Sequence, residues 1–197
     1  MNKFKKLFTK YKIDGYIVPK NDEYFNEYVP EYKDRLKFIS KFSGSAGFAI
    51  ILKNKNYLFV DGRYTTQAFN QSGKKFKIVT IPRKFPKNVI KTHKEITIGF
   101  DPKLHTEQQL NFIFKIKNVK LKSLEKNLVD IVWSKKRKNN TDSYYSMPKH
   151  VVGNNAKNKI LQVKKLLIKN KIDLLLVTAP ENVAWILNIR GKDSFHS

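Results

Sequence analysis

The sequence predicts an α/β protein in which helices flank a β-sheet, followed by an incomplete second copy of the same unit. Four observations support this fold class. The chain begins with an amphipathic helix that leads into a short apolar strand, and two apolar runs farther along are spaced as a hairpin. Helices and strands then alternate up to residue 133, and the opening helix–strand pattern returns after residue 150.

The first helix is predicted from hydrophobic spacing. Apolar residues recur at i, i+3, i+4 and i+7, which places them on one face of a helix. These residues are Phe4, Leu7, Phe8 and Tyr11. We expect Gly15 to end the helix. Residues 16–18 (YIV) then form a short buried strand, which Pro19 stops because proline lacks the N–H that a strand ladder needs.

A loop, a short helix, a tight turn and a hairpin follow. Residues 20–34 are polar and form the loop, and residues 35–39 begin the helix. Residues 43–47 (SGSAG) form the turn, in which glycine permits a positive φ. Two apolar runs, at 48–52 and 57–60, have the spacing of an antiparallel hairpin.

The remainder of the first domain alternates helices and strands. We expect helices over 63–71 and 87–92, and strands over 77–81, 96–100 and 119–121. Thr106 is a suitable N-cap for a helix through Ile116, because its hydroxyl accepts a hydrogen bond from an otherwise unpaired backbone N–H. An apolar helical turn over 127–133 completes the domain.

A change in composition marks the predicted domain boundary. Residues 134–140 are all polar and mostly cationic, as is typical of a linker. We therefore expect a first domain at 1–133, a basic linker at 134–150 and the truncated start of a second domain at 151–197.

An internal repeat supports the second domain. Residues 6–14 align with residues 165–173 at an offset of 159, and the match resumes with residues 38–39 facing 185–186. Gly44 then faces Gly191. A helical stripe leads into an expected strand over 173–177, so two copies of one α/β unit are implied. The stripe consists of Ala156, Ile160, Val163 and Leu167. Trp185 is interpreted as a core aromatic, and Arg190 with Gly191 as a helix end.

Composition and charge exclude several classes of site. The chain has no cysteine, which excludes thiolate metal sites and a cysteine nucleophile and is compatible with the cytoplasm. No apolar run is long enough to span a membrane. The net charge of +24 suggests an anionic partner, but it is divided between both halves of the chain. We therefore favour a solvated basic surface over a nucleic-acid or membrane site.

No catalytic, metal or cofactor residue is predicted. The histidines at 93, 105, 150 and 196 have no metal-ligand spacing, so surface or capping roles are favoured. Ser45 has Gly44 and Gly47 beside it, which is the wrong spacing for a nucleophile elbow. The order helix, loop, strand around these glycines does not suit a phosphate cradle, which requires a helix after the loop.

The best candidate for a functional surface is the segment 61–68 (DGRYTTQA), where a strand ends and a helix begins. Asp61 is placed to cap the helix, and Arg63 to pair with a carboxylate on a partner surface. In the alternative interpretation, Asp61 and Arg63 only stabilise the corner where the strand passes into the helix. We favour this structural interpretation over a functional surface.

Five blocks together resemble one family. They are residues 14–19 (DGYIVP), 43–47 (SGSAG), 61–68 (DGRYTTQA), 127–133 (NLVDIVW) and 184–191 (AWILNIRG). In order and spacing they resemble the N-terminal part of the Xaa-Pro aminopeptidases, or aminopeptidases P, of the M24 metallopeptidase family. The resemblance is to the long three-domain form, and it covers essentially the whole chain.

The resemblance implies a creatinase-type N-terminal domain with a mixed sheet, and an incomplete second copy. It implies a parent hydrolase that removes an N-terminal residue preceding proline. Its dinuclear metal centre, typically manganese, belongs to a C-terminal pita-bread domain that these residues do not include. The N-terminal domains of the family contribute to dimer contacts and shape the entrance to the active site. Arg63 and Tyr64 are therefore candidates for a surface that faces the catalytic domain.

Two other functions remain open at this stage. One is a free-standing interaction module without catalytic activity. The other, which the even spread of charge disfavours, is a basic polyanion-binding protein whose affinity would fall steeply with salt.

Overall fold

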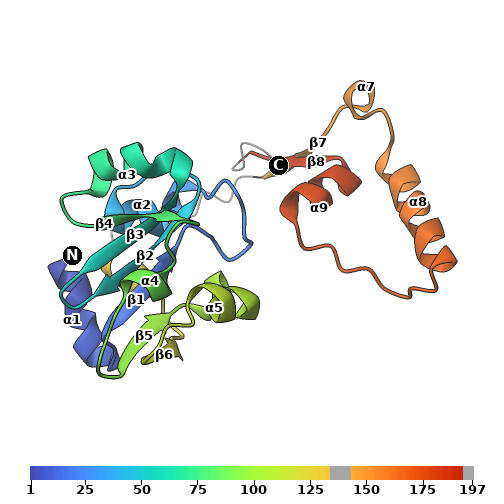
Figure 1. The fold of residues 1–197 in the computed structure, drawn as a ribbon. Helices are drawn as coiled ribbons and strands as arrows, with labels where there is room; N and C mark the ends of the chain where they lie inside the picture. The colour runs from blue at the N-terminus through green and yellow to red at the C-terminus, as the bar shows by residue number, and fades with distance from the viewer. Residues whose placement is uncertain (134–142, 193–197) are drawn as a thin grey trace. The chain divides into compact units, whose positions relative to one another are not determined.

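The computed structural model describes residues 1–133 and 143–192 (Figure 1). These residues form two compact units, which are described separately. The first unit contains residues 1–23 and 31–133, and the second contains residues 24–30 and 143–192. The predicted linker at 134–150 falls mostly outside the described residues, and its last part includes a strand and the start of a helix.

A six-stranded mixed sheet forms the centre of the first unit, as the fold prediction expected. Its strands are β1 Gly15–Pro19, β2 Gly47–Leu52, β3 Asn56–Asp61, β4 Lys77–Ile81, β5 Ile96–Phe100 and β6 Val119–Ser123. Their order across the sheet is β4-β3-β2-β1-β5-β6. The pairs β1–β2 and β2–β3 are antiparallel, and the other three pairs are parallel. The predicted hairpin and all of the strands predicted before residue 133 are therefore confirmed.

Helices cover both faces of this sheet. They are α1 Asn2–Tyr11, α2 Arg35–Ser40, α3 Thr65–Ser72, α4 Pro86–Val89, α5 Glu107–Ile113 and α6 Leu128–Val132, with short 3-10 helices at Glu31–Lys33 (η1), Gly62–Tyr64 (η2) and Pro102–Leu104 (η3). Tyr16 and Val18 of β1 point into one apolar cluster, with side chains of α1, α2, α3 and α6. Ile17 points into a second cluster on the opposite face, because side chains alternate along a strand.

Two predictions for the first unit are wrong in detail. Helix α1 ends at Tyr11, where Lys12 adopts a left-handed φ of 51°, and not at Gly15. Gly15 is instead the first residue of β1, where a Cβ atom would lie 2.8 Å from the carbonyl oxygen of Ile51. Helix α5 ends three residues before the predicted Ile116, because Phe114 and Ile116 turn into the core.

Helix α4 is also shorter than the predicted segment 87–92.

The glycines of the SGSAG turn are needed for different reasons. Gly47 has a φ of 158°, whereas at Gly44 there is no space for a side chain. A Cβ atom there would lie 2.3 Å from the Phe42 ring and 2.9 Å from the Tyr64 ring. The constraint at Gly44 is therefore the close approach of two aromatic rings and not a positive φ.

The second unit contains β7 Tyr144–Ser146, α7 Lys149–Val152, α8 Ala156–Lys169, α9 Pro180–Leu187 and β8 Ile189–Gly191, and β7 pairs antiparallel with β8. The strand predicted over 173–177 is not formed. Its leucines at 174, 175 and 176 are exposed, and no neighbouring strand among the described residues pairs with them. A strand needs backbone partners outside itself, so an apolar run alone does not produce one.

Two interpretations near residue 190 are also wrong. Trp185 is 57% exposed and is not a core residue. Arg190 and Gly191 lie in β8, because α9 already ends at Leu187 and Asn188 takes up a left-handed conformation.

The internal repeat is visible in how the helices end. Lys12 and Lys171, at the offset of 159, both have left-handed backbones, with φ of 51° and 54°. The N–H of Ile13 donates to Phe8 O at 3.0 Å, and the N–H of Ile172 donates to Leu167 O at 2.9 Å, at the same offset. Helices α1 and α8 therefore end with the same hydrogen-bonded turn.

The ends of helices α2 and α9 repeat in the same way, at the offset by which residues 38–39 align with residues 185–186. Lys41 and Asn188 are both left-handed, with φ of 73° and 54°. Their N–H groups donate to Lys37 O and Ala184 O, at equivalent positions. The repeat therefore extends from the sequence to the local backbone of two helix ends.

We predict that Gly15→Ala destabilises the first unit by about 1–3 kcal/mol, because the new methyl group would overlap backbone that cannot move without breaking the β1–β2 pairing. Thermal or urea unfolding of the chain, followed by circular dichroism, measures this loss. Gly62→Ala is the matched control, since its Cβ atom would meet nothing closer than Thr80 Cγ2 at 3.7 Å. Equal stability of the two variants would contradict the account of Gly15.

Candidate functional site

The candidate residues Arg63 and Tyr64 lie at the corner where β3 passes through η2 into α3. Asp61 Oδ1 accepts hydrogen bonds from the backbone N–H and from the Nε of Arg63, both at 2.9 Å. Arg63 lowers the pKa of the Asp61 carboxyl through these hydrogen bonds. The Arg63 side chain is 75% exposed, so it is accessible at the surface.

Tyr64 makes contacts at both its hydroxyl and its ring. Its hydroxyl lies 2.8 Å from Ser45 Oγ, and its ring meets the Phe42 ring edge-on with 5.9 Å between centroids. The Arg63 guanidinium carbon lies 5.6 Å from the centre of the Tyr64 ring. Tyr64 therefore joins the corner to the SGSAG turn.

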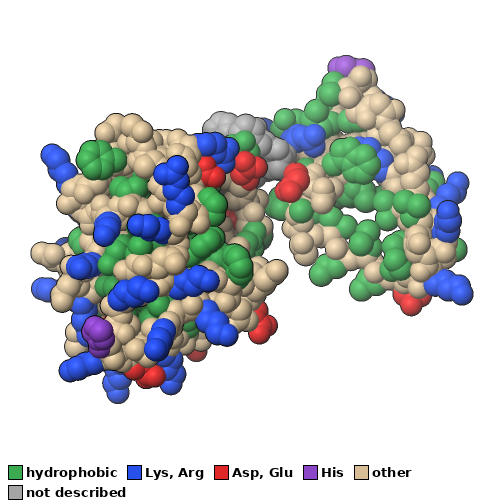
Figure 2. All heavy atoms as spheres, viewed as in Figure 1, with side chains coloured by type: hydrophobic (Ala, Val, Ile, Leu, Met, Phe, Trp, Pro, Cys, Tyr) green, Lys and Arg blue, Asp and Glu red, His purple; other side chains and the backbone are tan. Residues whose placement is uncertain are grey.

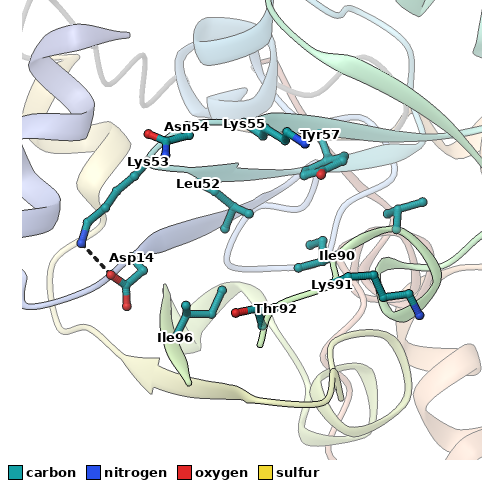
Figure 3. A pocket seen from close by; sticks show the side chains of 11 residues that line it. Asp14, Leu52, Lys53, Asn54, Lys55, Tyr57, Ile90, Lys91, Thr92 and Ile96 are labelled. Atoms are coloured by element: carbon teal, nitrogen blue, oxygen red, sulfur yellow. Dashed lines mark hydrogen bonds and ion pairs between the residues drawn. The ribbon is translucent and has the colours of Figure 1, made fainter. Parts of the chain in front are cut away.

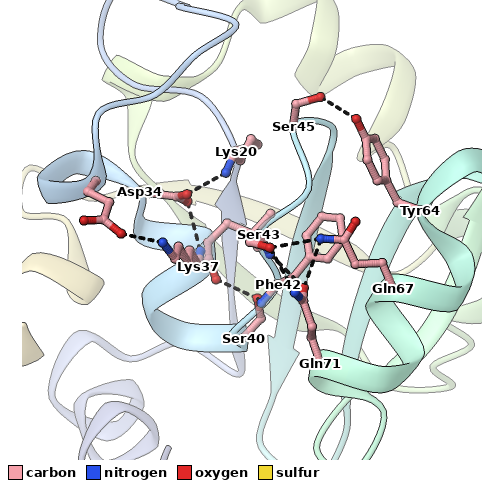
Figure 4. A network of polar contacts seen from close by, with 12 residues as sticks. Lys20, Asp34, Lys37, Ser40, Phe42, Ser43, Ser45, Tyr64, Gln67 and Gln71 are labelled. Carbon is pink, nitrogen blue, oxygen red and sulfur yellow. Dashed lines mark hydrogen bonds and ion pairs between the residues drawn. The ribbon is translucent and has the colours of Figure 1, made fainter. Parts of the chain in front are cut away.

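A second set of contacts fastens the SGSAG turn to α3 (Figure 4). Gln67 Nε2 and Gln71 Nε2 each donate to Ser43 Oγ at 2.9 Å. The N–H of Ser43 donates to Gln71 Oε1 at 3.0 Å. The sequence analysis identified the turn at 43–47 and the segment 61–68 as separate motifs. In the structure they form one polar corner that these hydrogen bonds hold together.

A buried ion cluster centred on Arg35 was not predicted. Arg35, which is 3% exposed, donates from Nε and Nη2 to the two carboxylate oxygens of Asp130 at 2.8 and 2.9 Å. Its Nη2 also donates to Glu23 Oε1 at 2.6 Å, and Lys33 lies 3.1 Å from the other oxygen of Glu23. The cluster ties the loop before α2 to α6, which are about a hundred residues apart in sequence.

The charges in this cluster shift each other's titration. Burial raises the pKa of Glu23, but a backbone hydrogen bond and the bond and charge of Arg35 outweigh it and lower the pKa to about 2. Burial lowers the pKa of Arg35, and the carboxylates of Asp130 and Glu23 outweigh that effect and raise it. Each ion therefore remains charged because its partners do.

A second buried ion pair lies beside the same loop (Figure 4). Lys20 Nζ donates to Asp34 Oδ2 at 2.5 Å. The other oxygen of Asp34 accepts from the N–H of Lys37 at 3.0 Å and so caps α2. Both ions are largely buried. The Asp34 carboxylate therefore fixes the start of α2 in two ways, as the N-cap of the helix and as the partner of Lys20.

A cavity of about 410 Å³ opens at the other end of the first unit (Figure 3). Three lysines, at 53, 55 and 91, line it together with Asp14, Tyr57 and Ile90. Asp14 pairs with Lys53 at 2.6 Å and accepts from the N–H of Thr97 at 2.9 Å, and both contacts lower its pKa. Asp14 thus serves to hold the start of β5 beside β1.

The histidines are not brought together. His105 is buried between the Phe100 and Phe114 rings, with Nδ1 2.9 Å from Asp101 O, and burial lowers its pKa. His93 and His150 are exposed and apart in sequence, and His196 lies outside the described residues. Within residues 1–133 and 143–192, no group of three or more metal-ligating side chains is found.

Lysine and arginine side chains are spread over the visible face of the first unit and do not gather in one patch (Figure 2). None of the helices in the described part of the chain has the length and hydropathy needed to cross a membrane.

Comparisons with known proteins give one consistent family. The family model described as the creatinase/prolidase N-terminal domain matches residues 1–131, and a second model with the same description matches residues 134–197. A Laccaria bicolor protein named "Probable Xaa-Pro aminopeptidase P" is 34% identical over 97% of this chain. Aminopeptidase P1 of Lotus japonicus is 34% identical over 92% of the chain. The chain spans about a third of the length of these relatives, 31% and 28%.

Solved structures agree with this result. The X-prolyl aminopeptidase of Caenorhabditis elegans, described as a cytosolic enzyme with a di-nuclear active site, matches 98% of this chain with a TM-score of 0.80 and 26% identity. The match covers 34% of that enzyme. The aminopeptidase P of Streptococcus thermophilus matches 66% of this chain with a TM-score of 0.50 and 20% identity, which supports the fold alone.

We predict that the stability of the first unit falls as the pH drops from about 4.5 to about 2, the range between the ordinary pKa of Glu23 and its value in the folded chain. The unfolded chain binds this proton first, so acid favours unfolding. We expect about 2 kcal/mol for this group, less than the full shift would give, because solvent screens the partly exposed carboxylate. Glu23→Gln removes that part of the pH dependence in urea unfolding measured between pH 2 and pH 7.

The matched control is Glu125→Gln, at an exposed position that makes no ion pair with the described residues. If Glu23→Gln and Glu125→Gln left the same acid profile, the ion cluster would not stabilise the first unit through Glu23.

Proposed function

The chain belongs to the creatinase/prolidase N-terminal domain family, and we propose that it is the non-catalytic N-terminal portion of an Xaa-Pro aminopeptidase-like protein. The observation that carries the proposal is the match of 98% of the chain to one third of the C. elegans X-prolyl aminopeptidase. The parent enzyme would release an N-terminal residue from peptides with proline at the second position. It would act in the cytoplasm, as that relative is described to do.

The dinuclear metal centre of such an enzyme, which we expect to hold manganese, would lie in a C-terminal catalytic domain of the same polypeptide. The residues described for this chain do not fit such a centre, because it needs several carboxylate and histidine ligands that converge, and none converge here. We propose that the chain's contribution to the enzyme is positional.

We propose that the first unit serves dimerisation and shapes the entrance to the active site through the corner of Arg63 and Tyr64. Two features of the corner support this role. The SGSAG turn and α3 hold Tyr64 in place, so the corner is rigid. Arg63 is exposed beside it and can pair with a carboxylate across an interface, because its guanidinium offers several donors in a fixed plane.

The test is a chimera in which this chain replaces the matching third of the Laccaria bicolor relative. We predict that the chimera hydrolyses an Xaa-Pro peptide in the presence of Mn²⁺ and that Arg63→Ala lowers kcat/KM or weakens the dimer by about fivefold, the loss of one exposed charged contact. Peptide hydrolysis and analytical ultracentrifugation measure the two effects. Lys94→Ala is the control, at an exposed site before β5, at the opposite end of the sheet.

Two outcomes count against the proposal. An unchanged kcat/KM, stability and dimer in the Arg63→Ala chimera would remove the role of the corner. Hydrolysis of the same peptide by this chain alone would overturn the assignment of a non-catalytic portion.

A further inference from the structure

Lys159 is a buried cation of the second unit, and none of the described residues places a carboxylate beside it. Its side chain lies on α8, and the residue is 5% exposed. The ammonium donates to Trp185 O at 2.7 Å and to Asn188 Oδ1 at 2.6 Å, and it lies 4.1 Å from the centre of the Trp185 ring. All of these partners are uncharged.

The buried cations of the first unit, in contrast, have carboxylate partners. Lys20 is paired with Asp34, and Arg35 is paired with Asp130 and Glu23. In residues 24–30 and 143–192, which make up the described part of the second unit, the acidic residues are Glu27, Asp173 and Glu181, and all three are exposed. None of them lines the cavity beside Lys159. Since a buried charge is costly unless it is paired, the absence of a counter-charge for Lys159 within the described residues requires an explanation.

Arg190 adds a second cation to the same place. Its Nη1 donates to Ile189 O at 2.7 Å and to Ala184 O at 3.3 Å, which fixes the guanidinium at the C-terminal end of α9. Its Nε and Nη2 have no partner among the residues that the structure describes. The half-buried side chain therefore keeps one edge of its donor fork available.

Lys159 and Arg190 line one cavity of about 220 Å³, together with Met147, Val151, Val152, Trp185 and Asn188. The negative end of the α9 dipole offsets part of the positive charge, but it amounts to only about half an elementary charge. The cavity thus combines the buried ammonium of Lys159, the edge of the Arg190 guanidinium that carries Nε and Nη2, and apolar lining residues. A carboxylate satisfies both cations, because its two oxygens match the planar fork of an arginine.

We propose that this cavity of the second unit is a carboxylate-binding site in which Arg190 holds the anion and Lys159 neutralises it. The carboxylate belongs either to the C-terminus of a peptide or to an Asp or Glu side chain of a protein segment. Both present the same chemistry to the two cations. The size of the cavity suits a small planar anion and not a large ligand.

The probe is acetate, compared with acetamide, which has nearly the same shape and no charge. Trp133→Phe in the full chain leaves Trp185 as the one tryptophan, so its fluorescence reports on the cavity. We expect a saturable change with acetate at constant ionic strength and none with acetamide. An acetate response that does not saturate, or an equal response to acetamide, overturns the proposal.

Variants in the same background assign the site. Arg190→Gln is expected to weaken acetate binding about tenfold or more, because a charge-assisted bidentate contact is lost. Lys157→Met, an exposed lysine on the same helix, is the matched control and is expected to bind as the parent does. Unchanged binding in Arg190→Gln overturns the proposal. If that variant loses helix content, Arg190→Lys keeps the charge without the fork and is expected to weaken binding as well.

Two further probes separate the sources of the carboxylate. N-acetylglycine carries a free α-carboxylate, and N-acetylaspartate N-methylamide carries only a side-chain carboxylate. Tighter binding of the first identifies a peptide C-terminus as the ligand, and tighter binding of the second identifies an acidic side chain. Failure of both to compete with acetate for the fluorescence change contradicts the site.

Discussion

The first unit depends on the burial of β1 on both faces and on its pairing along both edges. All five residues of β1 are buried. The strand pairs along its full length with β2 and, at Gly15 and Tyr16, with β5. Ile17 and Val18 lie in opposite apolar clusters, and each such buried side chain contributes about 1.5–3 kcal/mol. The loops, the corner at Arg63 and the Arg35 cluster are all built around this central strand.

The second unit shows what the same local sequence does without those neighbours. Helices α8 and α9 form, because the hydrogen bonds of a helix are internal to it. Each is followed by a left-handed residue at the position equivalent to the one that follows α1 or α2. Residues 174–178, at the position equivalent to β1, form no strand, because the hydrogen bonds of a strand lie outside it. The three exposed leucines at 174–176 therefore mark a core that these residues do not complete.

The same distinction explains how much the sequence alone predicted. Local signals worked well: the spacing of α1, the Thr106 cap of α5, the hairpin and the strand at Lys77–Ile81 are all confirmed. Contacts between distant residues were missed, among them the Arg35–Asp130 pair, the bond between Ser45 and Tyr64 and the β7–β8 pairing. The corner at 61–68 was identified as a motif, but its connection to the SGSAG turn needed the three-dimensional structure. No local pattern marks residues that meet across nineteen or more positions.

The family assignment and the two units lead to one account: a complete creatinase-type domain, followed by a second copy whose strand lacks partners within the described residues. Amide hydrogen exchange tests this account most directly, because it reports backbone hydrogen bonds residue by residue. The account predicts slow exchange at Ile17 and Val18 of β1, and exchange close to that of an unfolded chain at residues 174–178. Equal protection of the two segments would contradict it, since the second copy would then hold a paired strand.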